Sequence, residues 1–183
     1  EVFQTFTPNL LRNDKKSLPN IEDSSINGYK VNESDMHQSL TASQTKAIKN
    51  INTDKEFNIS LLHGVTGSGK TEVYLNLVSD IINKNQAALI LVPEINLTPQ
   101  LHKVFSTRFN GEIGLYHSKQ TPLQRFKVWS KARSGNIRIV IGTRSAIMNP
   151  ILNLGLIIID EEHDQSFKQS EGFKFSAREL GIK

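Results

Sequence analysis

Residues 59–71 read Ile-Ser-Leu-Leu-His-Gly-Val-Thr-Gly-Ser-Gly-Lys-Thr, and this stretch decides the fold. The apolar run 59–63 predicts a short buried strand that enters a glycine-rich turn. Residues 64–71 then fit the pattern G-x-x-x-x-G-K-[ST] in full. Apolar residues recur at helical spacing over 72–84, so a helix is expected next. A strand, a glycine-rich turn and a helix in this order predict a loop that cradles phosphate.

The residue types in this loop suit the chemistry of phosphate binding. Glycines let backbone N–H groups approach phosphate oxygens without a Cβ in the way, and the helix start turns its positive end toward the anion. Lys70 supplies a cation for the β- and γ-phosphates, and the Thr71 hydroxyl can ligate Mg²⁺. The predicted nucleotide-binding residues are Gly64, Thr66, Gly67, Ser68, Gly69, Lys70 and Thr71. The alternative is a glycine-rich turn with a purely structural role.

Outside the loop, apolar runs alternate with helical patterns. Strands are expected at 87–92, 113–116, 137–141 and 156–159, and helices at about 41–51, 98–109, 121–134 and 176–182. Strands that are apolar throughout and alternate with helices predict an α/β fold with a mostly parallel sheet covered on both faces. Residues 1–38 are polar and aperiodic, and we interpret them as a linker or the tail of a preceding domain. Residues 39–183 form the predicted globular unit.

The last predicted strand ends in acids, because residues 156–163 read Leu-Ile-Ile-Ile-Asp-Glu-Glu-His. In open α/β sheets, ligands bind at the carboxyl ends of strands. Asp160 is therefore a candidate Mg²⁺ ligand, and Glu161 a candidate general base that polarises the attacking water. Acids also cap many strand ends without a function. For His163 we favour a hydrogen-bonding relay over a metal ligand or a pH-titrating group.

Composition fits a soluble globular protein, since 37% of the 183 residues are hydrophobic and 22% are charged. No apolar run has the roughly 18–20 residues that a membrane span needs, and the sequence contains no Cys. The net charge of +4 is unevenly spread. Residues 103–144 carry nine Lys or Arg and one acid, Glu112, which predicts either a surface for a polyanion or a solvated helical face.

The order of these motifs resembles the superfamily 2 DExH helicases, whose motor lobes have a RecA-like P-loop fold. Residues 64–71 look like motif I, 91–100 like motif Ia, 141–146 like motif Ib, and Asp-Glu-Glu-His at 160–163 like motif II. The amino-acid sequences of these segments resemble the PriA family of replication-restart helicases in particular. The resemblance covers about residues 40–180. It implies the ATP-binding lobe of a 3′→5′ DNA helicase.

The resemblance also implies roles for residues outside the phosphate loop. Gln44 occupies the place of a Gln that contacts adenine, although an exposed helical Gln is the simpler alternative. The aromatic stretch after the acids matches a loop that senses single-stranded DNA, but its rings here are all Phe and could instead belong to the core. The implied DNA-binding or coupling residues are Thr98, Gln100, Thr143, Arg144, His163, Phe167, Lys168, Phe173, Lys174 and Phe175.

By the same resemblance, the cofactors are ATP and Mg²⁺, and zinc is expected only in parts of the protein beyond this sequence. The implied partners are single-stranded and forked DNA, a second helicase lobe, primosome proteins and single-strand DNA-binding protein, in the bacterial cytoplasm at the nucleoid and without a membrane. Because the second lobe supplies an arginine finger, we expect this chain alone to bind nucleotide weakly and to turn over very slowly. The alternatives are another DExH translocase, a nucleotide- or DNA-binding module without turnover, and a small-molecule kinase.

Overall fold

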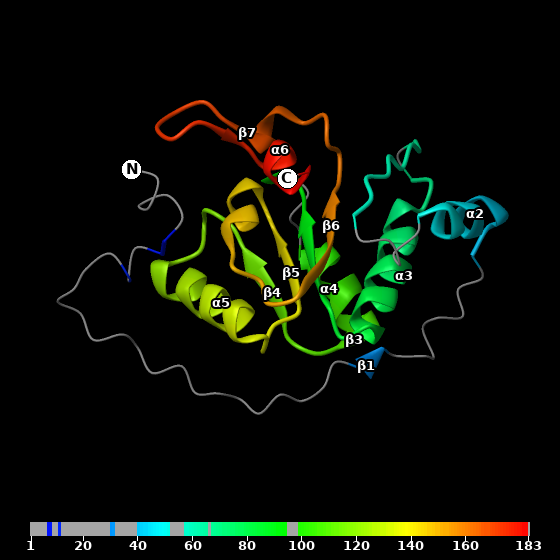
Figure 1. The fold of residues 1–183 in the computed structure, drawn as a ribbon, viewed down its shortest axis with the longest axis horizontal. Helices are drawn as coiled ribbons and strands as arrows, with labels where there is room; N and C mark the ends of the chain where they lie inside the picture. The colour runs from blue at the N-terminus through cyan, green and yellow to red at the C-terminus, as the bar shows by residue number, and fades with distance from the viewer. Residues whose placement is uncertain are drawn as a thin grey trace.

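The computed structural model describes residues 7–8, 11, 30–31, 40–51, 57–65, 67–94 and 99–182. Strands run through the middle of the molecule and helices lie on both sides of them (Figure 1). The α-helices are α2 (Ala42–Asn50), α3 (Lys70–Asn83), α4 (Pro99–Arg108), α5 (Pro122–Ser134) and α6 (Ala177–Ile182), and the 3-10 helices are η4 (Arg144–Met148) and η5 (Gln165–Phe167). The strands are β1 (Lys30–Val31), β2 (Ala87–Leu91), β3 (Phe109–Asn110), β4 (Ile113–Tyr116), β5 (Ile139–Gly142), β6 (Leu154–Ile159), β7 (Lys168–Gln169) and β8 (Phe175–Ser176).

The central sheet consists of four parallel strands in the order β4-β5-β2-β6. This confirms the predicted α/β fold with a parallel sheet. Every residue of β2 and of β5 is buried, as expected for strands with helices on both faces. Because all four strands point the same way, the segments that follow them meet at one edge of the sheet. The segments after β2, β5 and β6 carry the residues of motifs Ia, Ib and II.

The two faces of the sheet belong to two separate apolar clusters, because side chains alternate along a strand. Ala88 and Ile90 of β2 pack with α3 and with Phe105 of α4 on one face. Leu89 and Leu91 pack with α5, η4 and α6 on the other. This arrangement anchors α3, the helix after the glycine-rich loop, directly against the sheet.

Local signals explain where the helices begin. Thr41 and Thr121 each accept a hydrogen bond from the backbone of the third helical residue, whose Gln side chain bonds back to the cap. These are capping boxes, which satisfy N–H groups that the helix itself leaves unpaired. Pro122 begins α5, where its lack of an N–H costs nothing. The helices predicted at about 41–51 and 121–134 are therefore confirmed.

The strand predicted at 59–63 is wrong. Residues 57–65 contain no strand, and the large apolar side chains of Phe57, Ile59 and Leu61 are 66%, 60% and 79% exposed. An apolar run becomes a buried strand only where a sheet edge pairs with its backbone, and the described sheet ends at β6.

Residues 30–31, inside the segment interpreted as a linker, form β1, which pairs antiparallel with β3. Within the described ranges, none of the helices has both the length and the hydrophobicity needed to cross a lipid bilayer.

Candidate functional site

The glycine-rich loop leads directly into the first turn of α3. Gly67 and Gly69 have φ values of 80° and 81°, in the left-handed region that residues with a Cβ rarely adopt. Gly69 is the N-cap of α3, so the helix begins at Lys70, as the motif predicts. The Lys70 ammonium group donates a hydrogen bond to the Gly64 carbonyl oxygen at 2.9 Å and so lies back across the loop. Thr66 lies outside the described residues.

Helix α2 contacts this loop through Gln44. The Gln44 side-chain amide donates to the Gly69 carbonyl oxygen at 3.2 Å, and its side-chain oxygen accepts from the Thr41 N–H at 2.8 Å. A Cβ at position 69 would displace the Gln44 amide, and the positive φ independently favours glycine there. The predicted Gln44 is thus next to the loop, and its contact with adenine stays a prediction.

The acidic turn 160–163 follows β6 and lies beside α3. The Asp160 N–H donates to the Leu91 carbonyl oxygen of β2 at 2.9 Å, which fixes the start of the turn. The Asp160 Oδ1 atom accepts a hydrogen bond from the Tyr74 hydroxyl of α3, also at 2.9 Å. Burial, followed by the negative charge of Asp160, raises the pKa of Tyr74 well above its ordinary value, so the hydroxyl remains a donor. The structure therefore brings the phosphate loop's helix and the acidic turn together.

Glu161 has an unusual backbone conformation. Its φ of 50° lies in the left-handed region, where a non-glycine residue is uncommon. Residues held in such conformations cluster at functional sites, where the surrounding structure stabilises them. Here the Asp164 N–H donates to the Glu161 carbonyl oxygen at 2.8 Å and closes the turn. The Glu161 carboxylate is therefore carried on a tight turn next to Asp160.

The donors at this edge fit a magnesium-bound nucleotide. Mg²⁺ prefers oxygen ligands and takes only one or two from protein when phosphates supply others. The Thr71 hydroxyl is in the first turn of α3, and Tyr74 ties the Asp160 carboxylate to the same helix. Lys70 adds a cation suited to phosphate oxygens, and Ser68 is an exposed loop residue. The residues present therefore suit the cofactor that the sequence predicts.

The predicted DNA-contacting residues fall into different environments. Thr98 lies outside the described residues, and Gln100 is exposed in the first turn of α4. Thr143 is only 5% exposed, so its hydroxyl is not presented to a strand of DNA. The Arg144 guanidinium donates to the carbonyl oxygens of Ser166 and Lys168, at 3.3 and 2.6 Å. In this structure Arg144 connects motif Ib to the segment after the acidic turn.

That segment is the hairpin β7–β8, which carries the predicted aromatic loop. Phe173 in the connecting loop stacks with Phe175 of β8, with ring centroids 6.2 Å apart, and the Arg144 guanidinium lies 5.9 Å from the Phe175 ring centre. Lys168 and Lys174 are exposed beside them. Rings and cations are therefore interleaved here, as base stacking with phosphate attraction requires.

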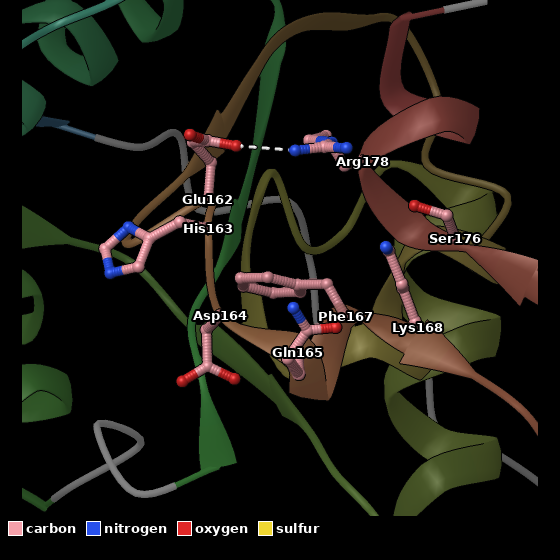
Figure 2. Close-up of a pocket in the computed structure, with 8 residues that line it drawn as sticks. All are labelled: Glu162, His163, Asp164, Gln165, Phe167, Lys168, Ser176 and Arg178. Carbon is pink, nitrogen blue, oxygen red and sulfur yellow. Dashed lines mark hydrogen bonds and ion pairs between the residues drawn. The ribbon is translucent and has the colours of Figure 1, made fainter.

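Phe167 departs from this pattern. In Figure 2 its ring lies between the acidic turn and the segment of Ser176 and Arg178, and it is only 2% exposed. It belongs to the apolar cluster on the α5 face of the sheet. The structure contradicts a base contact by Phe167, because this apolar ring is already buried in the core. The alternative of a core Phe therefore holds at Phe167, and it holds in part at Phe175, which is half-buried and packs against the same cluster.

Figure 2 also shows how the acidic turn is tied to the end of the chain. Glu162 accepts a hydrogen bond from the Arg178 guanidinium of α6 at 2.9 Å, whereas the His163 ring points away from this pair and is exposed. The pair and the surrounding residues line a small cavity of about 50 Å³. No described contact of the His163 ring tests its predicted relay role.

The basic stretch 103–144 does not form one continuous surface. Arg108 is 4% exposed and forms an ion pair with Glu72 in the first turn of α3. Arg138 precedes β5, at the opposite end of the strands from the acidic turn, and donates to the Asn85 side chain at 2.9 Å. The interpretation of this stretch as a polyanion surface is therefore wrong for Arg108, whose charge is buried and paired. For Arg138, which is half-exposed beside a neutral Asn, it stays a prediction.

Sequence reasoning assigned no role to Tyr74, Glu72 or Arg178. Each of these side chains contacts a residue distant in sequence, so no local sequence pattern predicts the contact. One signal was available for Tyr74, which lies four residues after Lys70 and so shares its side of the helix. A residue with a polar tip at that position is able to reach the site.

Comparison with known proteins agrees with this geometry. Over 143 residues the chain is 50% identical to the replication restart protein PriA of Haemophilus influenzae, covering 78% of this chain and 20% of that protein. It is 50% identical over 132 residues to PriA of Synechocystis and 46% identical over 128 residues to PriA of Bacillus subtilis, in each case 16% of the relative's length. The chain thus spans about a fifth or less of these relatives, and the identities confirm the resemblance to the PriA family.

Residues 41–181 match the DEAD/DEAH box helicase family, which is more than half of the chain. The matched range contains the glycine-rich loop, the acidic turn and the whole parallel sheet that brings them together. The chain belongs to the DEAD/DEAH box helicase family.

Proposed function

We propose that this chain is the ATP-binding motor lobe of a 3′→5′ DNA helicase that acts in replication restart. The observation that carries the proposal is the hydrogen bond between Tyr74 of α3 and Asp160 at the end of β6, which puts the phosphate loop and the acidic turn at one edge of the sheet. The high identity to PriA proteins supports the assignment to replication restart. Residues 39–183 are the proposed lobe, and residues 1–38 a connection to a preceding domain.

The proposed mechanism assigns each residue one task. Lys70 and the backbone of the loop bind the phosphates, and Gln44 contacts the adenine. Thr71 and Asp160 would hold Mg²⁺, which neutralises charge on the phosphates when it is bound. Glu161 accepts a proton from the attacking water, and the closed turn keeps its carboxylate next to Asp160.

DNA would cross the same edge of the sheet. Gln100, Lys168 and Lys174 are exposed and offer donors to phosphates, while Phe173 and Phe175 offer rings to bases. Such contacts bind without reading sequence and weaken as salt rises. Arg144 acts in this scheme as a coupling residue, because it holds the aromatic hairpin to the segment after β5. Thr98 and His163 complete the proposed set.

The whole protein requires more than this chain. A second lobe would supply an arginine finger, which contributes about 10³–10⁵ in rate in related phosphoryl-transfer sites. The chain alone should therefore bind nucleotide weakly and hydrolyse it very slowly. Forked DNA, primosome proteins and single-strand DNA-binding protein are the proposed partners, in the bacterial cytoplasm at the nucleoid. Any zinc would be bound outside this sequence.

The test is ATP hydrolysis with and without single-stranded DNA, measured on the chain and on a version extended through a second lobe. We expect DNA-stimulated hydrolysis only in the extended protein, and its loss in Glu161→Gln. Gln has about the size of Glu and adopts the left-handed backbone at position 161 at a similar cost. The variant therefore tests the loss of the carboxylate charge alone. Absence of stimulation in the extended protein would refute the helicase proposal, and phosphate transfer to a small molecule regardless of DNA would favour the kinase alternative.

A further inference from the structure

The contact between Tyr74 and Asp160 joins two segments that lie 86 residues apart. Asp160 is the first residue after β6, and its main chain is fixed by the bond to the Leu91 carbonyl oxygen. Its carboxylate remains free to rotate unless something holds it, because the terminal torsion of an Asp side chain has a broad energy minimum. The Tyr74 hydroxyl is the group that the structure places on Oδ1, at 2.9 Å.

Tyr74 is well suited to hold another side chain still. Its ring packs against the apolar cluster formed by α3, α4 and the sheet. A tyrosine has only two side-chain torsions, so a packed ring leaves its hydroxyl in a fixed place. The neighbouring residues Val73 and Leu75 are 2% and 3% exposed, so the turn of α3 that carries Tyr74 is itself rigidly anchored.

The same turn of α3 is continuous with the phosphate loop. Lys70 and Thr71 precede Tyr74 by about one helical turn, so the backbone of one helix carries all three residues. A carboxylate has about four lone-pair positions, and the Tyr74 hydroxyl occupies one of them. The remaining positions stay available to a cation.

We propose that Tyr74 is a positioning residue, which orients the Asp160 carboxylate toward the cation of a bound nucleotide and ties that orientation to the phosphate loop. This inference rests on the proposed function, since it concerns the same site. In this role Tyr74 contacts Asp160 and not the phosphates or the cation. Its effect is carried through Asp160, as is common for residues that hydrogen-bond to metal ligands.

The experiment compares Tyr74→Phe with the wild-type chain. Phe keeps the packed ring and removes only the hydroxyl. Binding of a fluorescent ATP analogue is measured first in EDTA and then during a titration with Mg²⁺. Loss of such a partner typically costs about 10–100-fold in metal affinity. We therefore expect the Mg²⁺ concentration that gives half of the Mg²⁺-dependent increase in analogue binding to rise at least about tenfold in Tyr74→Phe. The affinity for the analogue in EDTA should stay within about twofold of the wild-type value.

Tyr116→Phe is the matched control, because it removes a hydroxyl from a buried tyrosine on β4, the strand farthest from β6 in the sheet. Its Mg²⁺ titration should match the wild type. A second comparison, between Asp160→Asn and the double variant Asp160→Asn/Tyr74→Phe, keeps the test independent of folding differences. Because Tyr74 acts through the Asp160 carboxylate, the two proteins should give the same Mg²⁺ titration. Circular dichroism of each variant serves to check that it is folded.

The possible results separate the two proposals. If the wild type binds the analogue more tightly with Mg²⁺ and Tyr74→Phe has the same Mg²⁺ midpoint, the positioning role is refuted and the proposed function stands. An equal loss of affinity with and without Mg²⁺ refutes it too, since that is the result of a structural role in α3. If the wild type shows no Mg²⁺-dependent binding, the proposed function fails, and this inference fails with it.

Discussion

The buried ion pair between Glu72 and Arg108 offers a quantitative test of how α3 is held in place. The pair joins the first turn of α3 to the last turn of α4. The two side chains differ in environment, because the side chain of Arg108 is 5% exposed and the side chain of Glu72 is 18% exposed. The bond to Glu72 is made by Nη2, and the other terminal nitrogen of Arg108, Nη1, is buried with no hydrogen-bond partner among the described residues. Removing Glu72 therefore leaves a buried cation without compensation, whereas removing Arg108 leaves a carboxylate that water reaches.

This asymmetry sets the size of each effect. Breaking a buried pair by removing one partner costs about 3–5 kcal/mol, so Glu72→Ala should lower the free energy of unfolding by about 3 kcal/mol or more. Arg108→Met keeps much of the packing, and its cost should be about 1–2 kcal/mol, the penalty of an unmade hydrogen bond. In the double variant the buried charge is gone, so the loss should be smaller than the sum of the two single losses by about 1–3 kcal/mol.

Urea unfolding at neutral pH, followed by circular dichroism, measures all four proteins. With a slope of about 2 kcal/mol per M, a loss of 3 kcal/mol moves the midpoint by about 1.5 M. The reasoning is refuted if Arg108→Met costs more than Glu72→Ala, or if the two losses are additive within about 0.3 kcal/mol.

Three further predictions follow from other described contacts. Leu89→Ala, in the central strand β2, should cost about 2–5 kcal/mol of unfolding free energy in urea, whereas Leu123→Ala, at a side chain 43% exposed, should cost little beyond about 0.5 kcal/mol. The Asp164 carboxylate accepts a hydrogen bond from the Ser166 N–H, which lowers the pKa of Asp164 below its ordinary value. The contribution of this bond to folding stability is therefore complete above the unfolded-state pKa and disappears as pH falls through the lower folded-state pKa. An NMR titration of the Asp164 side chain would show the lowered pKa. Arg144→Gln should increase amide hydrogen exchange in β7 and β8 while that in β2 stays unchanged, and equal exchange in the hairpin of both proteins would contradict its anchoring role.

The parallel sheet was predictable from the sequence because each of its strands is apolar along its whole length. β2 and β5 are buried on both faces, so they lack the alternation that would make them ambiguous. The loop glycines were predictable for a similar reason, since few residues other than glycine tolerate the positive φ at positions 67 and 69.

Other features depend on contacts that no local pattern contains. Residues 59–63 have the composition of a buried strand, yet pairing with a sheet edge decides whether they form one, and here Ile59 and Leu61 are exposed. The Phe-rich stretch after the acidic turn has a similar ambiguity. Phe167 and Phe173 are chemically identical, and only the path of the chain after Asp164 sends the first into the core. The partner of Tyr74 likewise becomes evident only once α3 and β6 lie side by side.

Nucleotide binding by the chain itself tests the central claim most directly, namely that the glycine-rich loop at the sheet edge holds the phosphates. The measurement is a fluorescence titration of a labelled ATP analogue with Mg²⁺, on the wild type, on Lys70→Ala and on the control Lys103→Ala, whose side chain is exposed on α4. We predict saturable, weak binding by the wild type and the control, and a loss of at least about tenfold in Lys70→Ala, because the charge-assisted bonds to phosphate are removed. Equal affinities in all three proteins would contradict the account.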